Sequence, residues 1–199
     1  MGANMKLLVV DCCMSLREQS RTQLLLKTFL KSWKEKNPTA EIETVDLKNM
    51  DIKPLDVDGV KARDAAVAAG KMDDPNLALA KQFADADRIV VAAPLWEMSF
   101  PSKLRVYIER ISIPGISFKY TETGSEGLCK SEKMLHIVTA GGPFSQVSAG
   151  KEYLENMSAF YGINQIDFVG ADMQDVEGFD YQSVLDKAAA RATEMAKTF

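Results

Sequence analysis

Short apolar segments alternate with amphipathic ones along most of the chain. Residues 6–11, 88–93 and 133–139 are mostly apolar, as expected of strands that are buried on both faces of a parallel sheet. Residues 165–170 form another short run of this kind, whereas residues 41–47 alternate charged with apolar side chains, which is typical of an edge strand. The pattern therefore predicts five strands.

Helical periodicity separates these strands. Residues 20–37 repeat apolar side chains every three or four positions, and the same spacing predicts helices at 76–86, 154–161 and 184–196. A further helix follows the third strand, where Ser99 is expected to be the N-cap and Pro101 to lie in the first turn. Residues 48–75 contain small and turn-forming residues, so we expect a loop that carries a short helix.

Alternating strands and helices predict a three-layer α/β/α fold, in which helices cover both faces of a parallel sheet. Five strands favour the order 2-1-3-4-5, and such sheets bind ligands outside the carboxyl ends of strands 1 and 3. The chemistry is therefore expected directly after Asp11, Ala93 and Thr139. Repeats, low-complexity tracts and linkers are absent, so a single domain is predicted over 1–199.

Charge and composition exclude several partners. The chain has 24 Lys and Arg residues against 28 Asp and Glu residues, and its net charge of −4 argues against nucleic-acid and anionic-membrane surfaces. No apolar run is long enough to cross a membrane. The first residues do not have the pattern of a signal peptide, so we expect a cytoplasmic protein.

The cysteines and the single histidine do not indicate a disulfide or metal site. Cys12 and Cys13 are adjacent, and no cysteine pair has Cys-x-x-Cys spacing. His136 lies inside an apolar strand, so no zinc site is expected and a structural role is favoured. A phosphatase-type Cys-x5-Arg loop is also excluded, because Glu18 and Gln19 stand where the arginine is required.

The segment after the first strand has the side chains of a phosphate site. Free N–H groups at a helix N-terminus attract anions, and hydroxyl and guanidinium groups add further donors. The alternative is an N-cap serine with solvated arginines. Gly-x-Gly-x-x-Gly and Walker motifs are absent, which argues against the usual dinucleotide turn and against ATP chemistry. The expected phosphate ligands are Ser15, Arg17, Ser20, Arg21 and Thr22.

The loops after the third and fourth strands suit a flat ring system. Large apolar side chains in the first of them form a wall for such a ligand or, alternatively, seal the end of the sheet. We expect the backbone of Glu97 to face the ring and its side chain to face outward. Consecutive glycines in the other loop allow close approach of the backbone to a ligand, or form a tight turn alone. The expected contacts are Pro94, Leu95, Trp96, Glu97, Met98, Thr139, Ala140, Gly141 and Gly142.

At these three loops the sequence resembles the FMN-dependent NADH:quinone oxidoreductases, also called azoreductases, of the flavodoxin-like superfamily. The resemblance covers nearly the whole chain and is most specific at 93–105, 115–120 and 124–128. Glu97 stands where this family has asparagine, and Ala140 where it has arginine or a similar polar residue. These departures predict weaker retention of FMN or a different substrate preference.

The resemblance implies FMN as cofactor and NADH or NADPH as co-substrate, with two electrons passing as hydride to quinones or azo compounds in a ping-pong reaction. The flavin carries this chemistry, so no catalytic side chain is expected. The resemblance also implies that Tyr120 and Phe144 line the substrate face. Phe160 matches an aromatic residue that reaches the neighbouring subunit's site in a homodimer, which would also cover Trp96 and Phe118.

Two other functions stay open at this point. One is a flavodoxin-like carrier that passes single electrons to a protein partner. Such carriers are usually shorter and more acidic, and they lack the segment at 114–130. The other is a binding protein that has the same fold and no flavin.

Overall fold

The computed structural model describes residues 4–14, 20–146 and 148–199. Its centre is a sheet of five parallel strands in the order β2-β1-β3-β6-β7. Counted without the two strands of a separate hairpin, this is the predicted order 2-1-3-4-5. The strands are β1 (Lys6–Asp11), β2 (Glu41–Asp46), β3 (Arg88–Ala92), β6 (Lys133–Thr139) and β7 (Gln165–Ala171).

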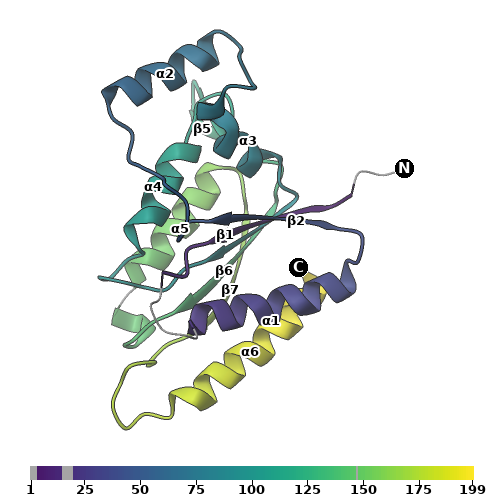
Figure 1. Cartoon of the computed structure of the whole chain (residues 1–199), viewed down its shortest axis with the longest axis vertical. Coiled ribbons are helices and arrows are strands. Elements are labelled where there is room, and N and C mark those ends of the chain that lie inside the picture. Colours follow the sequence, from purple (N-terminus) through teal and green to yellow (C-terminus); the bar gives the residue numbers. More distant parts are fainter. Residues whose placement is uncertain (1–3, 15–19, 147) are drawn as a thin grey trace.

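Helices cover both faces of the sheet, as predicted. Figure 1 shows α1 and α6 side by side on one face, with α3, α4 and α5 on the other and α2 at one end of the molecule. Two 3-10 turns, Pro75–Leu77 and Phe144–Gln146, precede α3 and α5. The helices are α1 (Arg21–Lys36), α2 (Val57–Ala68), α3 (Ala78–Asp85), α4 (Ser102–Ile111), α5 (Ser148–Phe160) and α6 (Tyr181–Thr198).

Burial on both faces explains why the central strands are continuously apolar. In β1, Leu7 and Val9 join the apolar cluster under α1 and α6, whereas Leu8 and Val10 join the cluster on the other face. Successive side chains of a strand point to opposite faces. Each of these four side chains is at most 1% exposed, so each contributes about 1.5–3 kcal/mol of hydrophobic free energy.

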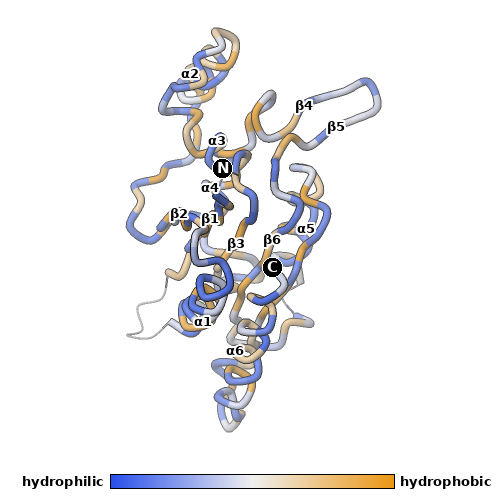
Figure 2. The backbone as a smooth tube through the Cα atoms, turned by 90° about the vertical axis from the view of Figure 1, so that its right-hand side faces the viewer, coloured by the Kyte–Doolittle hydropathy of each residue, from blue (hydrophilic) through white to orange (hydrophobic). Residues whose placement is uncertain are grey.

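Residues 114–130 contain an antiparallel hairpin that the sequence pattern did not reveal. Its strands β4 (Phe118–Thr121) and β5 (Gly124–Gly127) project from the body and are mostly hydrophilic (Figure 2). Phe118 was expected to be exposed in a single subunit, and this is wrong. Its side chain is only 4% exposed, because the ring packs 4.3 Å from that of Phe160 and 5.3 Å from that of Tyr120.

Two local expectations are corrected by the structure. Ser99 does not cap a helix; it closes a tight turn with Trp96, and α4 begins at Ser102 after Pro101. The helix within residues 48–75 is longer than expected, with twelve residues that begin after an N-cap at Asp56. Small residues with little apolar periodicity form this helix, so its pattern resembled that of a loop.

His136 is a core residue of β6. Its ring lies 5.3 Å from that of Phe100 and 5.6 Å from that of Phe168, and the residue is 1% exposed. Burial, assisted by the charge of Lys151, lowers the pKa of His136 from 6.5 to about 3. The imidazole is therefore neutral at physiological pH.

This burial predicts a pH dependence of stability. Below pH 6.5 the unfolded chain takes up a proton at His136 that the folded protein does not bind until about pH 3, so the free energy of unfolding falls as the pH falls through this window. The expected loss from this residue is about 2 kcal/mol between pH 6.5 and pH 5. His136→Phe and His136→Leu should both flatten the pH profile measured by urea unfolding. An unchanged slope in both variants would contradict a buried neutral imidazole.

Candidate functional site

A cavity of about 330 Å³ opens at the carboxyl edge of the sheet. It brings together residues from all three of the loops that the sequence singled out. The predicted residues that line it are Ser20, Arg21, Thr22, Pro94, Leu95, Trp96, Thr139, Ala140 and Gly141.

The remaining predicted residues lie elsewhere. Glu97, Met98 and Gly142 belong to the same loops but are not part of the cavity wall. Tyr120, Phe144 and Phe160 do not line it either. Ser15 and Arg17 fall outside the described residues. Their role as phosphate ligands stays a prediction from the sequence.

Parallel pairing explains why these loops meet. Asp11 at the end of β1 pairs with Ala92 at the end of β3, and Ala92 pairs with Ile137 of β6. Hydrogen bonds continue beyond the strands, from Cys12 N to Ala92 O at 2.8 Å and from Leu95 N to Thr139 O at 2.9 Å. All three loops therefore leave the sheet at one edge.

The start of α1 forms one end of the cavity. Ser20 is the N-cap, and its hydroxyl oxygen accepts a hydrogen bond from Gln23 N at 3.3 Å. The hydroxyl of Thr22 is buried and lies 2.7 Å from that of Thr139, which ties the first loop to the third. One hydroxyl of this pair donates, and the other still has its own proton for a ligand.

Arg21 is held by the segment between β7 and α6. Its Nη1 donates to the carbonyl oxygen of Gln174 at 2.5 Å and to Asp175 Oδ1 at 2.9 Å. Its guanidinium group lies 4.4 Å from the centre of the Tyr181 ring. Figure 1 shows this segment passing beside the start of α1.

The loop after β3 turns back on itself within two residues. Trp96 and Ser99 exchange two backbone hydrogen bonds of 3.0 and 2.8 Å, and Glu97 and Met98 between them have φ values of 50° and 67°. Positive φ at both central residues is what a type I′ hairpin turn requires, and Asn-Gly is its preferred sequence. The side chain of Glu97 is exposed, as expected, and Trp96 is 45% exposed.

The loop after β6 is held by backbone hydrogen bonds from the segment after β7. Met173, Gln174 and Asp175 donate their backbone N–H groups to the carbonyl oxygens of the third loop at 3.0–3.2 Å. Gly141 and Gly142 accept two of these bonds. Among the described residues we find no acceptor for the N–H groups of these two glycines. Of these two N–H groups, that of Gly141 belongs to a residue of the cavity wall and is therefore available to a ligand there.

Gln174, Asp175 and Met14 are cavity residues that the sequence analysis missed. Gln174 is 3% exposed, and its Nε2 donates to the carbonyl oxygens of Asp172 and Tyr181. These two bonds fix the orientation of the amide, and its Oε1 is buried without a hydrogen-bond partner among the described residues. Topology could have pointed to Gln174 and Asp175, because β7 ends at the same edge of the sheet as β6 and the residues after it therefore lie near the cavity.

The thiols beside the cavity are poor nucleophiles. Burial raises the pKa of Cys12 to about 12 and raises that of Cys13 further, with Asp11 adding to the effect on both. Both side chains are at most 4% exposed. Thiolate chemistry at this site is therefore disfavoured at neutral pH. In the part of the chain that the structure describes, no three His, Cys, Asp or Glu residues are grouped so that they could hold a metal ion.

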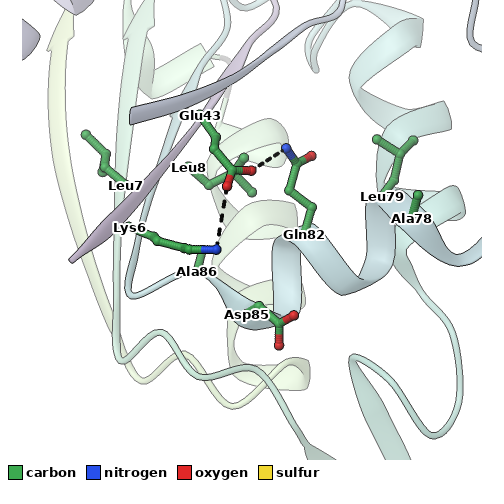
Figure 3. Close-up of a pocket in the computed structure, with 9 residues that line it drawn as sticks. All are labelled: Lys6, Leu7, Leu8, Glu43, Ala78, Leu79, Gln82, Asp85 and Ala86. Carbon is green, nitrogen blue, oxygen red and sulfur yellow. Dashed lines mark hydrogen bonds and ion pairs between the residues drawn. The ribbon is translucent and has the colours of Figure 1, made fainter. Parts of the chain in front are cut away.

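A second cavity of about 300 Å³ lies between β1, β2 and α3, away from these loops. Three of its four polar side chains, those of Lys6, Glu43 and Gln82, form a chain of interactions (Figure 3). Glu43 accepts a hydrogen bond from Gln82 Nε2 at 2.7 Å and lies 3.8 Å from Lys6 Nζ. The described lining of this second cavity has no guanidinium or hydroxyl group, whereas the cavity at the carboxyl edge has both. The cavity at the carboxyl edge is therefore the candidate site.

Comparison with known proteins shows the family of this chain. The model of the family described as "Flavodoxin-like fold" matches residues 5–196. FMN-dependent NADH:quinone oxidoreductase 2 of Clostridium acetobutylicum is 38% identical over 185 residues, which cover 90% of this chain and 92% of that protein. The FMN-dependent NADH:quinone oxidoreductase of Caldicellulosiruptor saccharolyticus is 34% identical, over 98% of this chain and 99% of that one.

The chain belongs to this family of flavodoxin-like oxidoreductases. A crystal structure of an azoreductase from Bacillus anthracis superposes with a TM-score of 0.88 at 25% identity, covering 98% of this chain and all of the other. An FMN-dependent NADH-azoreductase from the same species, solved in complex with FMN, gives a TM-score of 0.84 at 27% identity, covering 98% of this chain and 99% of the other.

The asparagine that the resemblance implies at position 97 would suit the backbone conformation that the structure shows there. At positive φ the Cβ atom of a non-glycine residue crowds the neighbouring carbonyl oxygen, and asparagine tolerates that region better than glutamate or methionine. Glu97 and Met98 therefore store strain in the turn that carries Trp96 into the cavity.

Replacing both residues with the preferred pair tests this strain. Glu97→Asn with Met98→Gly should raise the free energy of unfolding by about 1–2 kcal/mol, because both new residues accept the left-handed conformation. Urea denaturation of the flavin-free protein measures the change. As a control, Glu109→Asn alters an exposed position within helix α4 and should not stabilise the protein. A double variant that is no more stable than the parent would contradict the strain.

Proposed function

We propose that this protein is an FMN-dependent NAD(P)H:quinone oxidoreductase that also reduces azo compounds. The observation that carries the proposal is one cavity that joins three features: the N-terminus of α1 with its hydroxyl and guanidinium donors, an apolar wall with Trp96, and a glycine loop whose Gly141 N–H group is available to a ligand. The relatives' names point to the same cofactor and the same substrates.

The end of the cavity at α1 fits a phosphate group. A helix N-terminus carries a partial positive charge and unpaired N–H groups. Ser20 and Thr22 add hydroxyl groups, and Arg21 adds a cation that is only 20% exposed. Charge-assisted hydrogen bonds to such donors are stronger than neutral ones. The sequence places Ser15 and Arg17 in the same loop.

The other end fits the edge and face of a flavin ring. Leu95 and Trp96 provide apolar surface for stacking, and the N–H group of Gly141 in the cavity wall is available to a ring oxygen or nitrogen atom. The buried Oε1 of Gln174 needs a donor, which the ring N–H or a ribityl hydroxyl group would supply. An unpaired buried acceptor costs about 1–3 kcal/mol, so a ligand that satisfies it gains that much.

The chain's residues position and enclose the reactants rather than react with them. FMN, when bound, supplies hydride transfer from NADH or NADPH to a two-electron acceptor. Trp96 and the third loop would hold the ring, and the nicotinamide and then the acceptor would reach it through the same opening of the cavity. Shared use of one opening favours a ping-pong sequence. His136 is neutral and enclosed, and the Cys12 thiol stays protonated, so neither is placed to transfer a proton to substrate.

A homodimer completes the site in this proposal. Trp96, Met98 and Tyr120 are 45%, 56% and 75% exposed, which is unfavourable for large apolar side chains. We propose that a second copy covers them and that Tyr120, Phe144 and the partner's aromatic side chain at position 160 border the substrate face. The free thiols of Cys12, Cys13 and Cys129 favour a reducing, cytoplasmic location. No helix in the described part of the chain is suited to crossing a membrane.

The absorbance spectrum and steady-state kinetics test the function directly. The purified protein, saturated with FMN, should oxidise NADH in the presence of menadione and give parallel double-reciprocal lines. Bound flavin without turnover would favour the single-electron carrier instead. Failure to bind added FMN would favour the flavin-free binding protein.

Ser20 offers a clean test of the phosphate site. Aspartate and asparagine both replace serine well as an N-cap, so α1 should form in either variant. Ser20→Asp adds a negative charge beside the phosphate and should weaken FMN binding by at least about tenfold. Ser20→Asn keeps the cap without the charge and should have a much smaller effect. Equal affinities of the two variants, measured by quenching of flavin fluorescence, would place the phosphate elsewhere.

The dimer is tested by sedimentation. The parent protein should sediment as a species of twice 22.0 kDa at micromolar concentration. Tyr120→Lys puts a charge at the exposed end of the hairpin and should shift the protein toward monomer, whereas Thr123→Lys, at the turn of the same hairpin, serves as the control. A monomeric parent protein would contradict the proposed assembly.

A further inference from the structure

Arg21 already has partners within its own chain. Of the described residues that line the cavity, it is the one cation, and its guanidinium group contacts Gln174, Asp175 and Tyr181. All three partners lie between the end of β7 and the first turn of α6. The cation proposed for the phosphate is therefore paired with a carboxylate in the flavin-free fold.

The carboxylate of Asp175 is built into the cavity wall. Its backbone N–H donates to Gly141 O at 3.1 Å, and a Cβ atom at Gly141 would lie 3.0 Å from Asp175 Oδ2. The side chain thus lies between Arg21 and the third loop and adds negative charge at the end of the cavity that attracts an anion. Two anions on one guanidinium group compete for its N–H donors and repel each other.

We propose that Asp175 competes with the phosphate of FMN for Arg21 and thereby sets the affinity of this protein for phosphorylated flavin. This inference rests on the function proposed above. When the phosphate binds, the Nη1 hydrogen bond passes from Asp175 Oδ1 to a phosphate oxygen. The Asp175 side chain is 51% exposed, so water can take the place of Arg21 at Asp175 Oδ1. The Gln174 carbonyl oxygen and the Tyr181 ring keep Arg21 at the cavity.

Competition of this kind has an unusual consequence. Removing an acidic residue from the site should strengthen FMN binding, although the same change removes an ion pair from the flavin-free protein. A flavin without phosphate does not compete for Arg21, so its affinity should not respond. The comparison of FMN with riboflavin therefore separates competition at the phosphate from a contact with the ring.

The experiment measures the dissociation constants of FMN and riboflavin for the full chain by fluorescence quenching at low ionic strength. Asp175→Asn should lower the dissociation constant of FMN about fivefold, the scale of a half-exposed ion pair. It should change that of riboflavin less than about twofold. Glu177→Gln removes the same charge from the same exposed segment and should leave both constants unchanged.

A second pair of variants identifies Arg21 as the contested group. In an Arg21→Gln background, Asp175→Asn should change the affinity for FMN less than about twofold. A fivefold gain that persists without Arg21 would overturn the competition. So would an unchanged or weaker affinity for FMN in Asp175→Asn, an equal change for both flavins, or the same gain in Glu177→Gln.

The outcomes for this inference and for the proposed function are distinct. Absence of FMN and riboflavin binding in the parent and in every variant would refute the proposed function itself. Binding of FMN by the parent, with no gain in Asp175→Asn, would refute only the role of Asp175. Thermal unfolding of the flavin-free proteins confirms that each variant is folded, and Asp175→Asn should unfold at a slightly lower temperature because it lacks the ion pair.

Discussion

Parallel pairing of strands that are buried on both faces is the constraint on which this molecule depends. It forces every crossover through a helix and brings the carboxyl ends of β1, β3, β6 and β7 to one edge. Backbone N–H groups, hydroxyls and side chains from segments more than a hundred residues apart then meet there. The hydrogen bond between Thr22 and Thr139 is a direct product of this topology.

The site is rigid in some places and strained in others. Three backbone hydrogen bonds from the segment after β7 brace the glycine loop, which fixes donors where a ligand edge can reach them. The turn that presents Trp96 instead holds Glu97 and Met98 at positive φ. Strain of this kind persists only where the surrounding structure determines the conformation. Here the two backbone bonds between Trp96 and Ser99 do so.

Electrostatics lets the site distinguish ligands of different charge, which its shape alone does not. Buried Cys12 and His136 are kept neutral by the cost of charging them away from water. Among the described residues of the cavity wall, the charged side chains are those of Arg21 and Asp175, which meet at the start of α1. A family that leaves the chemistry to its cofactor needs its protein to balance affinity for that cofactor, and an internal anion is one means of setting it.

The amino-acid sequence by itself determined the five strands of the parallel sheet, their order and the three loops that line the cavity, because each depends on local periodicity and on general rules of topology. It also indicated Ser20, Arg21 and Trp96. It did not reveal the hairpin of β4 and β5. The tertiary structure alone decided the rest. Gln174 and Asp175 belong to a fourth loop whose side chains carry no local signal of ligand binding, and only their approach to Arg21 and Gly141 gives them a role. Ser99 is another position that local sequence could not decide. Its residue type suits both a helix cap and a turn, and backbone pairing with Trp96 places it in the turn.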